Sequence, residues 1–145
     1  MRRLAPAIIH KNQGAGARPR GAIYGVGVDI LRVARIEKVY RRHGRRFVER
    51  LLHARELSAF RTARKPALFL AKCFAVKEAF VKALGTGFNG VAHDEVGAIR
   101  DKLGRPELVF GAKLKRRLDR LKIKTTHLSL SDEGGLVCAM VVLGR

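Results

Sequence analysis

The chain has 145 residues, 47% of them hydrophobic, and this length and composition predict a single soluble domain with one core. Its 31 Lys and Arg against 12 Asp and Glu give a formal net charge of +19, which predicts a negatively charged partner or substrate. No apolar run is long enough to span a bilayer, and the absence of Trp, with only two Tyr, argues against stacking of single-stranded nucleic acid.

Residues 1–20 precede the first expected element. They contain Lys and Arg but no Asp or Glu, and the stretch Gly14–Pro19 consists mainly of Gly, Ala, Pro and Arg. We expect a disordered basic arm here, followed by one domain over residues 21–145. A transit peptide is an alternative, which the absence of serine and of an amphipathic repeat disfavours.

The first expected element is a buried strand over Ala22–Leu31, because this segment is apolar and rich in β-branched residues. Side chains alternate along a strand, so Gly25, Gly27 and Asp29 share one side. Two positions without side chains, leading to a carboxylate, allow another backbone or a ligand to approach closely. A dinucleotide fingerprint is excluded, because the third glycine and the start of a helix are missing.

Helices are expected next. Apolar residues recur at helical spacing from Val33 to about Arg64, with a break at Gly44, and the intervening residues are strongly basic. Leu68–Leu84 is apolar around most of its circumference and is followed by Gly85, which tolerates the left-handed conformation of a helix end. This helix is therefore expected at the centre of the domain.

The remaining segments alternate between strands and a helix. Asp94–Ile99 and Pro106–Phe110 are expected to be two paired strands, Gly111–Lys122 a short basic helix, and His127–Ser131 with Leu136–Leu143 a β-hairpin. This order predicts an α+β fold, with a small, mostly antiparallel sheet packed on a central apolar helix.

The two cysteines indicate a reducing compartment. Cys73 and Cys138 are far apart in sequence and neither belongs to a CxxC pair. We expect two reduced thiols in a cytoplasmic protein and no zinc site.

Glu78 is the charged residue that fits the central helix least well. At 100° per residue it falls beside Leu70, Phe74 and Val81, a stripe that is expected to be buried. A buried carboxylate without a partner is unfavourable, so a cation is expected next to it. Two candidates remain open at this point, an i,i+4 ion pair with Lys82 and a metal ion.

Asp29 favours the metal ion. A strand and the most apolar helix of a small domain are expected to pack together, which would bring Asp29 to Glu78. Mg²⁺ prefers oxygen ligands and typically takes one or two carboxylates, together with water and substrate phosphate. We therefore expect a magnesium site at Asp29 and Glu78, with Lys82 nearby and with phosphate as the substrate group. The Glu-x-Lys pattern of some nucleases is not met, because Phe80 stands two residues after Glu78.

The sequence resembles one known family, the holo-acyl carrier protein synthases. The most specific motifs are GxGxD at Gly25–Asp29 and FAVKEAFVKALGTG at Phe74–Gly87. Shorter matches occur in the same order along the chain, at Arg35-Ile36, Phe47–Leu52, Glu56-Leu57, Phe69–Lys72, Gly104–Pro106 and His127–Asp132. The resemblance extends from about residue 22 to the C-terminus.

The resemblance implies a 4′-phosphopantetheinyl transferase fold and a magnesium-dependent transferase. Such an enzyme moves 4′-phosphopantetheine from its co-substrate coenzyme A to a serine hydroxyl of apo-acyl carrier protein and releases 3′,5′-ADP. Asp29 and Glu78 would hold Mg²⁺, and Lys82 would contact the diphosphate and assist departure of 3′,5′-ADP. Besides Lys82, the coenzyme A cleft would be lined by Gly85, Thr86, Gly87, Ser129, Ser131 and Asp132.

The resemblance also implies partners. Arg35, helped by Arg42 and Arg46, would bind the acidic carrier protein, which would give the positive charge of the chain a function. Members of the family resemble compact homotrimers with sites at subunit boundaries, so a homotrimer is expected. The sequence leaves open whether the carrier protein serves fatty acid or polyketide synthesis.

Three departures from the family pattern stand out. Cys73 replaces the usual Arg, which puts one basic contact in doubt, and Leu136 replaces a common aromatic residue. The basic arm has no counterpart. The alternative interpretation is a nucleic-acid-binding domain without catalysis, which the charge favours but which gives no account of Asp29 and Glu78.

Overall fold

The computed structural model describes residues 22–145, so the predicted basic arm lies outside the described residues. The elements are β1 (Ile23–Arg32), α1 (Val33–Leu51), α2 (Ala54–Arg61), α3 (Pro66–Leu84), a 3-10 turn η1 (His93–Glu95), β2 (Val96–Arg100), β3 (Pro106–Phe110), α4 (Ala112–Arg120), β4 (Thr125–Glu133) and β5 (Leu136–Gly144). Within the described part, no helix is long and apolar enough to cross a membrane.

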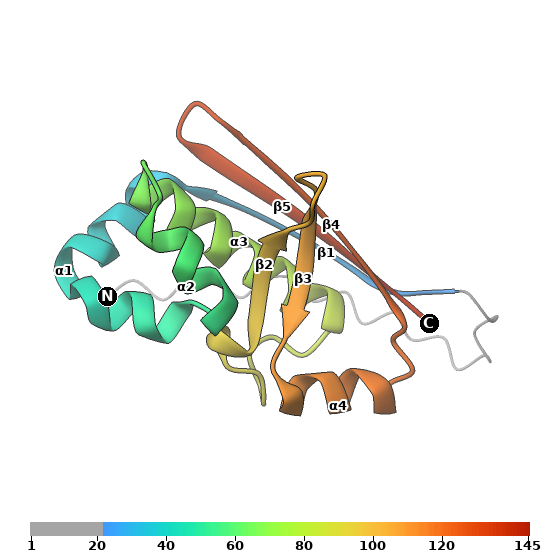
Figure 1. The fold of residues 1–145 in the computed structure, drawn as a ribbon. Helices are drawn as coiled ribbons and strands as arrows, with labels where there is room; N and C mark the ends of the chain where they lie inside the picture. Colours follow the sequence, from blue (N-terminus) through green and yellow to red (C-terminus); the bar gives the residue numbers. More distant parts are fainter. Residues whose placement is uncertain (1–21) are drawn as a thin grey trace.

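A three-stranded antiparallel sheet and the central helix form the body of the fold. The strand order is β1-β5-β4, and β2 pairs with β3 in a separate antiparallel sheet. Figure 1 shows α3 lying along the three long strands, with α1 and α2 near one end of the molecule and α4 below β2 and β3. The α+β class, the central helix and the C-terminal hairpin are confirmed.

Two expected boundaries differ from those observed. The break expected at Gly44 is confirmed as a kink within α1, where Gly44 has a φ of 50°. The helical segment also divides where α1 ends at Leu51 and α2 begins at Ala54, which was not expected. The strand expected from Asp94 begins at Val96, because His93–Glu95 form a 3-10 turn in which the Glu95 side chain accepts a hydrogen bond from the Ala92 N–H. Both differences lie at element ends, where local sequence is least informative.

The glycines of β1 allow α3 to lie directly against the sheet. A Cβ on Gly25 would stand 1.9 Å from the Ala83 carbonyl oxygen, and one on Gly27 would stand 1.8 Å from the Ala79 carbonyl oxygen. The approach predicted from the glycine pattern is therefore that of a helix backbone.

We expect Gly27→Ala to lower the free energy of unfolding by about 3 kcal/mol or more, because backbone atoms cannot move aside as a flexible side chain can. Thermal unfolding would measure the loss. The control is Gly111→Ala, since a Cβ there would meet its nearest neighbour at an ordinary 3.6 Å. Equal stability of the two variants would contradict the close packing of α3 on β1.

The other face of the sheet is apolar and open. The strand Ala22–Leu31 was expected to be buried, but only its glycine side is covered. Its opposite side carries exposed apolar side chains, and β5 adds two more; together they are Ile23, Val26, Val28, Ile30, Leu136 and Met140. We call these six residues the apolar sheet face.

Candidate active site

Asp29 and Lys82 meet between β1 and α3. The Lys82 Nζ donates to Asp29 Oδ1 at 2.8 Å and to the Val28 carbonyl oxygen at 3.0 Å. The Asp29 side chain is 13% exposed and that of Lys82 35% exposed. Of the two candidates that the sequence left open for the cation beside Glu78, the ion pair with Lys82 is not formed, because the Lys82 ammonium group pairs with Asp29.

Glu78 lies close to this pair. Its side chain is half-buried, and burial is the main cause that raises the pKa of its carboxyl group, followed by the negative charge of Asp29. The positive charges of Lys82 and Arg35 act in the opposite direction. Glu78 forms no ion pair with any of residues 22–145. Two carboxylates and one ammonium group therefore face one another here, and we call them the Asp29–Glu78–Lys82 cluster.

The turn after α3 leads directly away from this cluster. Gly85 and Gly87 have φ values of 81° and 57°, which a side chain would disfavour, and no atom lies within 4 Å of a Cβ placed on either residue. Between them, the Thr86 hydroxyl donates to the Gly87 carbonyl oxygen at 3.0 Å. The space above both glycines is therefore open to a ligand.

The hairpin residues do not all join this cluster in one chain. Asp132 forms an ion pair with Lys72 at 2.6 Å, which places it on the α3 side of the sheet. Strand alternation and the register with β5 place Ser129 and Ser131 on the opposite, exposed side, next to the apolar sheet face. Within a single chain, the two serines and the cluster are separated by the sheet.

The three arginines expected to bind the carrier protein lie on α1 in different surroundings. The Arg35 guanidinium lies 6.0 Å from the ring centre of Phe74 and contributes to the electrostatic environment of Glu78. Arg42 and Arg46 are exposed, one on each side of the kink at Gly44. Only Arg35 therefore lies near the cluster.

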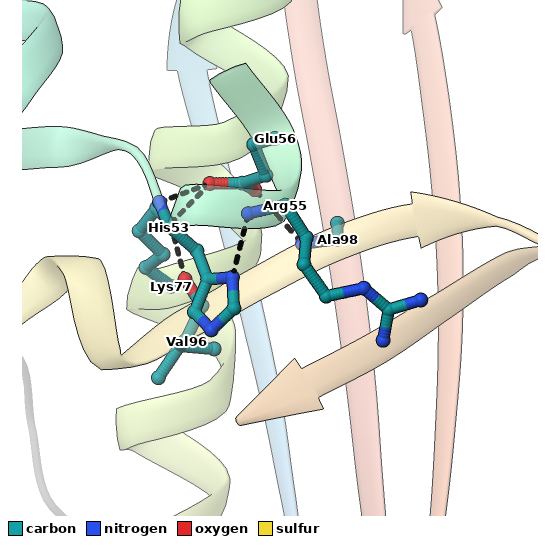
Figure 2. Close-up of polar contacts among 6 residues, drawn as sticks. All are labelled: His53, Arg55, Glu56, Lys77, Val96 and Ala98. Atoms are coloured by element: carbon teal, nitrogen blue, oxygen red, sulfur yellow. Dashed lines mark hydrogen bonds and ion pairs between the residues drawn. The ribbon is translucent and has the colours of Figure 1, made fainter. Parts of the chain in front are cut away.

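The deeply buried ion pair of the fold was missed by the sequence analysis. Lys77 and Glu56 have fully buried side chains, and the Lys77 Nζ donates to Glu56 Oε2 at 2.8 Å and to the Val96 carbonyl oxygen. Glu56 also accepts from the backbone N–H groups of His53 and Ala98, so the pair joins α3 to α2 and β2 (Figure 2). The prediction placed the buried charge of α3 at Glu78, which is only half-buried.

A sequence signal for this pair existed. At 100° per residue, Lys77 falls in the middle of a stripe formed by Leu70, Cys73, Phe80 and Leu84, all of which are buried. A lysine in such a stripe needs a buried acidic partner. The partner could not be chosen from the sequence, because Glu56 is 21 residues away on another helix.

Comparison with known proteins places the chain in a family. Residues 25–141 match the 4′-phosphopantetheinyl transferase superfamily. The chain is 47% identical over 122 residues to a protein of Azoarcus named holo-[acyl-carrier-protein] synthase, covering 83% of this chain and 97% of that protein. The chain is a member of the holo-acyl carrier protein synthase family.

Solved structures of this family share the fold. A holo-[acyl-carrier-protein] synthase from Neisseria meningitidis aligns with a TM-score of 0.83 and 42% identity, over 86% of this chain and all of that one. A synthase from Bacillus anthracis, in complex with coenzyme A (3′,5′-ADP), aligns with a TM-score of 0.70 and 31% identity, over 84% of this chain and 96% of that one.

This family member has a basic pocket on the other side of α3. The pocket has a volume of about 610 Å³ and is lined by apolar side chains, Cys73, Glu56, which is paired with Lys77, and a set of cations, which are Arg55, Arg64, Lys65, Lys72 and Arg100. Burial raises the pKa of the Cys73 thiol, so this residue supplies no charge in place of the usual Arg. Phe69 in the pocket wall lies about 180° from Glu78 around the helix axis, so the pocket and the cluster of one chain face opposite sides of α3.

Proposed function

We propose that this chain transfers 4′-phosphopantetheine from coenzyme A to a serine hydroxyl of an apo-acyl carrier protein and releases 3′,5′-ADP. The observation that carries the proposal is the meeting of Asp29, Glu78 and Lys82 in a member of this transferase family. Two carboxylates beside a lysine, next to an open glycine turn, suit a substrate that brings a diphosphate.

Asp29 and Glu78 fit a magnesium ion. Both offer hard oxygen ligands, and burial, followed by the negative charge of Asp29, raises the pKa of Glu78, which a nearby cation would oppose. The described residues contain no group of three or more His, Cys, Asp and Glu that could hold a metal, and two carboxylates leave ligand positions for water and phosphate oxygens. When bound, Mg²⁺ would neutralise charge on the diphosphate and on the leaving group.

The residues around the cluster would position coenzyme A. Lys82, in the last turn of α3, already contacts Asp29, and its ammonium group can exchange this carboxylate contact for a phosphate oxygen. In the proposed cleft, Gly85, Thr86 and Gly87 provide a backbone surface without bulky side chains. In the assembly proposed below, the basic pocket of a neighbouring chain would supply further cations for the phosphate groups of coenzyme A.

The carrier protein is proposed to bind beside this cleft. Arg35 adjoins Glu78, and Arg42 and Arg46 extend the positive surface along α1. An acidic protein would be attracted by a chain of net charge +19 and would be oriented by these arginines. A cytoplasmic location is part of this proposal, supported by the two free cysteines.

We also propose a homotrimer in which the apolar sheet face is buried between chains. Exposed apolar patches of this kind mark interfaces. Ser129 and Ser131 adjoin this face, and the basic pocket lies opposite the cluster. Association would allow hairpin and pocket residues of one chain to complete the site of its neighbour.

Val28→Asp tests the assembly. Val28 is 48% exposed in the single chain, so an aspartate there should be tolerated by the fold but should oppose burial between chains. We expect the particle mass, measured by light scattering during gel filtration, to fall from that of a trimer to that of a monomer. Leu103→Asp, in the exposed β2–β3 turn, should leave the mass unchanged. A wild-type monomer would contradict the proposal.

The transfer itself is tested by incubating the protein with coenzyme A, Mg²⁺ and an apo-acyl carrier protein. Mass spectrometry should show the carrier heavier by one phosphopantetheine group, on a serine.

The relatives reported above are synthases, which gives no support to the nucleic-acid-binding alternative. Salt-sensitive binding of DNA or RNA without any transfer would nevertheless restore that alternative. Separate assays with fatty acid and polyketide carriers would determine which are substrates.

A further inference from the structure

The turn after α3 is connected to the helix by stacked aromatic rings. His93, the first residue of η1, lies nearly parallel to Phe88, with ring centres 3.8 Å apart and an angle of 15° between the planes. It also stacks on Phe74 of α3, with a centre distance of 6.1 Å and an angle of 26°. We call these three rings the aromatic stack. Phe88 directly follows Gly87, and Phe74 lies one helical turn before Glu78, so the stack joins the turn to the helix that carries the candidate site.

The backbone of the turn has few strong restraints of its own. The Gly85 N–H is held by the carbonyl oxygens of Val81 and Lys82, at 3.0 Å and 3.1 Å. The backbone hydrogen bonds after Gly85 are longer, with N–O distances of 3.4 Å from Thr86 to Val81, 3.4 Å from Asn89 to Thr86 and 3.3 Å from Val91 to Phe88. Its glycines are also the residues with the greatest conformational freedom. The ring of Phe88 is therefore an important anchor between Gly87 and Val91.

A second anchor holds only the far end of the turn. The Arg117 Nη1 of α4 donates to the carbonyl oxygens of Asn89 and Gly90, at 3.1 Å and 3.3 Å. These contacts lie after Phe88 in the sequence, so they hold the part of the turn that leads into η1. Gly85 is held by the end of α3, so the part of the turn that depends most on the stacking of Phe88 on His93 is Thr86 and Gly87.

His93 is suited to stacking as a neutral ring. Burial is the main cause that lowers the pKa of His93, the positive charge of Lys77 lowers it further, and Asp94 acts in the opposite direction. The ring forms no hydrogen bond to a side chain or backbone group of residues 22–145. Its contribution within the described chain is therefore its packing against the two phenylalanines.

We propose that His93 is a positioning residue that, through Phe88, holds the Gly85–Gly87 turn in the conformation that receives coenzyme A. The inference rests on the proposed function, in which this turn lines the cofactor cleft. A turn that is already ordered loses less conformational entropy on binding than a free one. His93 therefore contributes to coenzyme A affinity and not to the chemical step.

The test compares His93→Ala with His93→Phe in the full-length protein. The alanine variant should raise the KM for coenzyme A about five- to tenfold and leave kcat within about twofold, because only ground-state positioning is lost. The phenylalanine variant keeps a flat ring and should restore the KM. In the absence of any ligand, hydrogen–deuterium exchange of the segment 85–91 should be faster in His93→Ala than in the wild type, and exchange in β5 should be unchanged.

Two further variants separate stacking from general destabilisation. Phe88→Ala should reproduce the His93→Ala phenotype, and the double variant should be no worse than either single one, because both remove the same contact. Tyr40→Ala removes the edge-to-face pair with Phe60 elsewhere in the fold and should lower stability without changing the KM for coenzyme A.

Several results would overturn the inference. The first is a His93→Ala variant in which both the KM for coenzyme A and the exchange of residues 85–91 are unchanged. The second is exchange that becomes faster throughout the protein in this variant, and the third is a His93→Phe variant that restores neither the KM nor the exchange rate. If the wild type transfers no phosphopantetheine, the proposed function fails, while the exchange measurements still decide whether His93 holds the turn.

Discussion

Glu78→Gln should abolish phosphopantetheine transfer while leaving the fold intact. Glutamine has nearly the same volume as glutamate but is a weaker magnesium ligand and carries no charge. The expected loss in kcat/KM is at least about 10²–10³-fold, the range seen when one group that stabilises developing charge is removed. Turnover with coenzyme A and carrier protein over a range of Mg²⁺ concentrations would measure it. Glu133→Gln, on the exposed end of β4, is the matched control and should retain activity.

The same variant should be more stable than the wild type when no metal is bound. Burial in the folded state, followed by the charge of Asp29, raises the pKa of Glu78. The protonated carboxyl group therefore favours the folded state, and this stabilising contribution is present at low pH and is lost as the pH rises through the raised pKa. Near pH 7.5 in EDTA, removing the charge of Glu78 should therefore raise Tm. The rise should be only roughly 1–2 °C, because solvent screens the charge of a half-exposed group. A lower Tm with unchanged magnesium-dependent turnover would remove Glu78 from the proposed site.

Lys77→Met should have the largest effect on stability. Methionine fits the apolar stripe of α3, but the substitution leaves the Glu56 carboxylate buried without its cation. Removing one partner of a buried pair lowers the free energy of unfolding by about 3–5 kcal/mol. For a domain of this size, Tm should fall by roughly 10 °C. Chemical and thermal unfolding would measure both quantities.

The double variant Glu56→Gln with Lys77→Met distinguishes loss of charge pairing from loss of packing. Glutamine can still accept from the His53 or Ala98 N–H groups and carries no buried charge, so it should recover part of the stability. Lys113→Met, on the exposed side of α4, should change the free energy of unfolding by no more than about 0.5 kcal/mol. A loss in Lys77→Met as small as in this control would show that the buried pair does not tie α2 and β2 to α3.

Local patterns predicted most of the elements. The apolar run before Gly85 predicted α3 and its left-handed end, and the glycines of β1 predicted a close backbone approach. These predictions succeed because helical and strand periodicity, and the conformational freedom of glycine, act over a few neighbouring residues. The expectation that Asp29 lies near Glu78 also follows from such patterns, once β1 and α3 are assumed to pack together.

The partners of individual charges were decided by the tertiary structure. The sequence by itself determined the α+β class, the family resemblance and the candidate residues Asp29, Glu78 and Lys82. Only the folded chain showed that Lys82 pairs with Asp29, that Lys77 is buried with Glu56, and that the hairpin serines face away from the cluster. Each of these depends on segments far apart in sequence, whose relative rotation and strand register are set by packing across the whole domain.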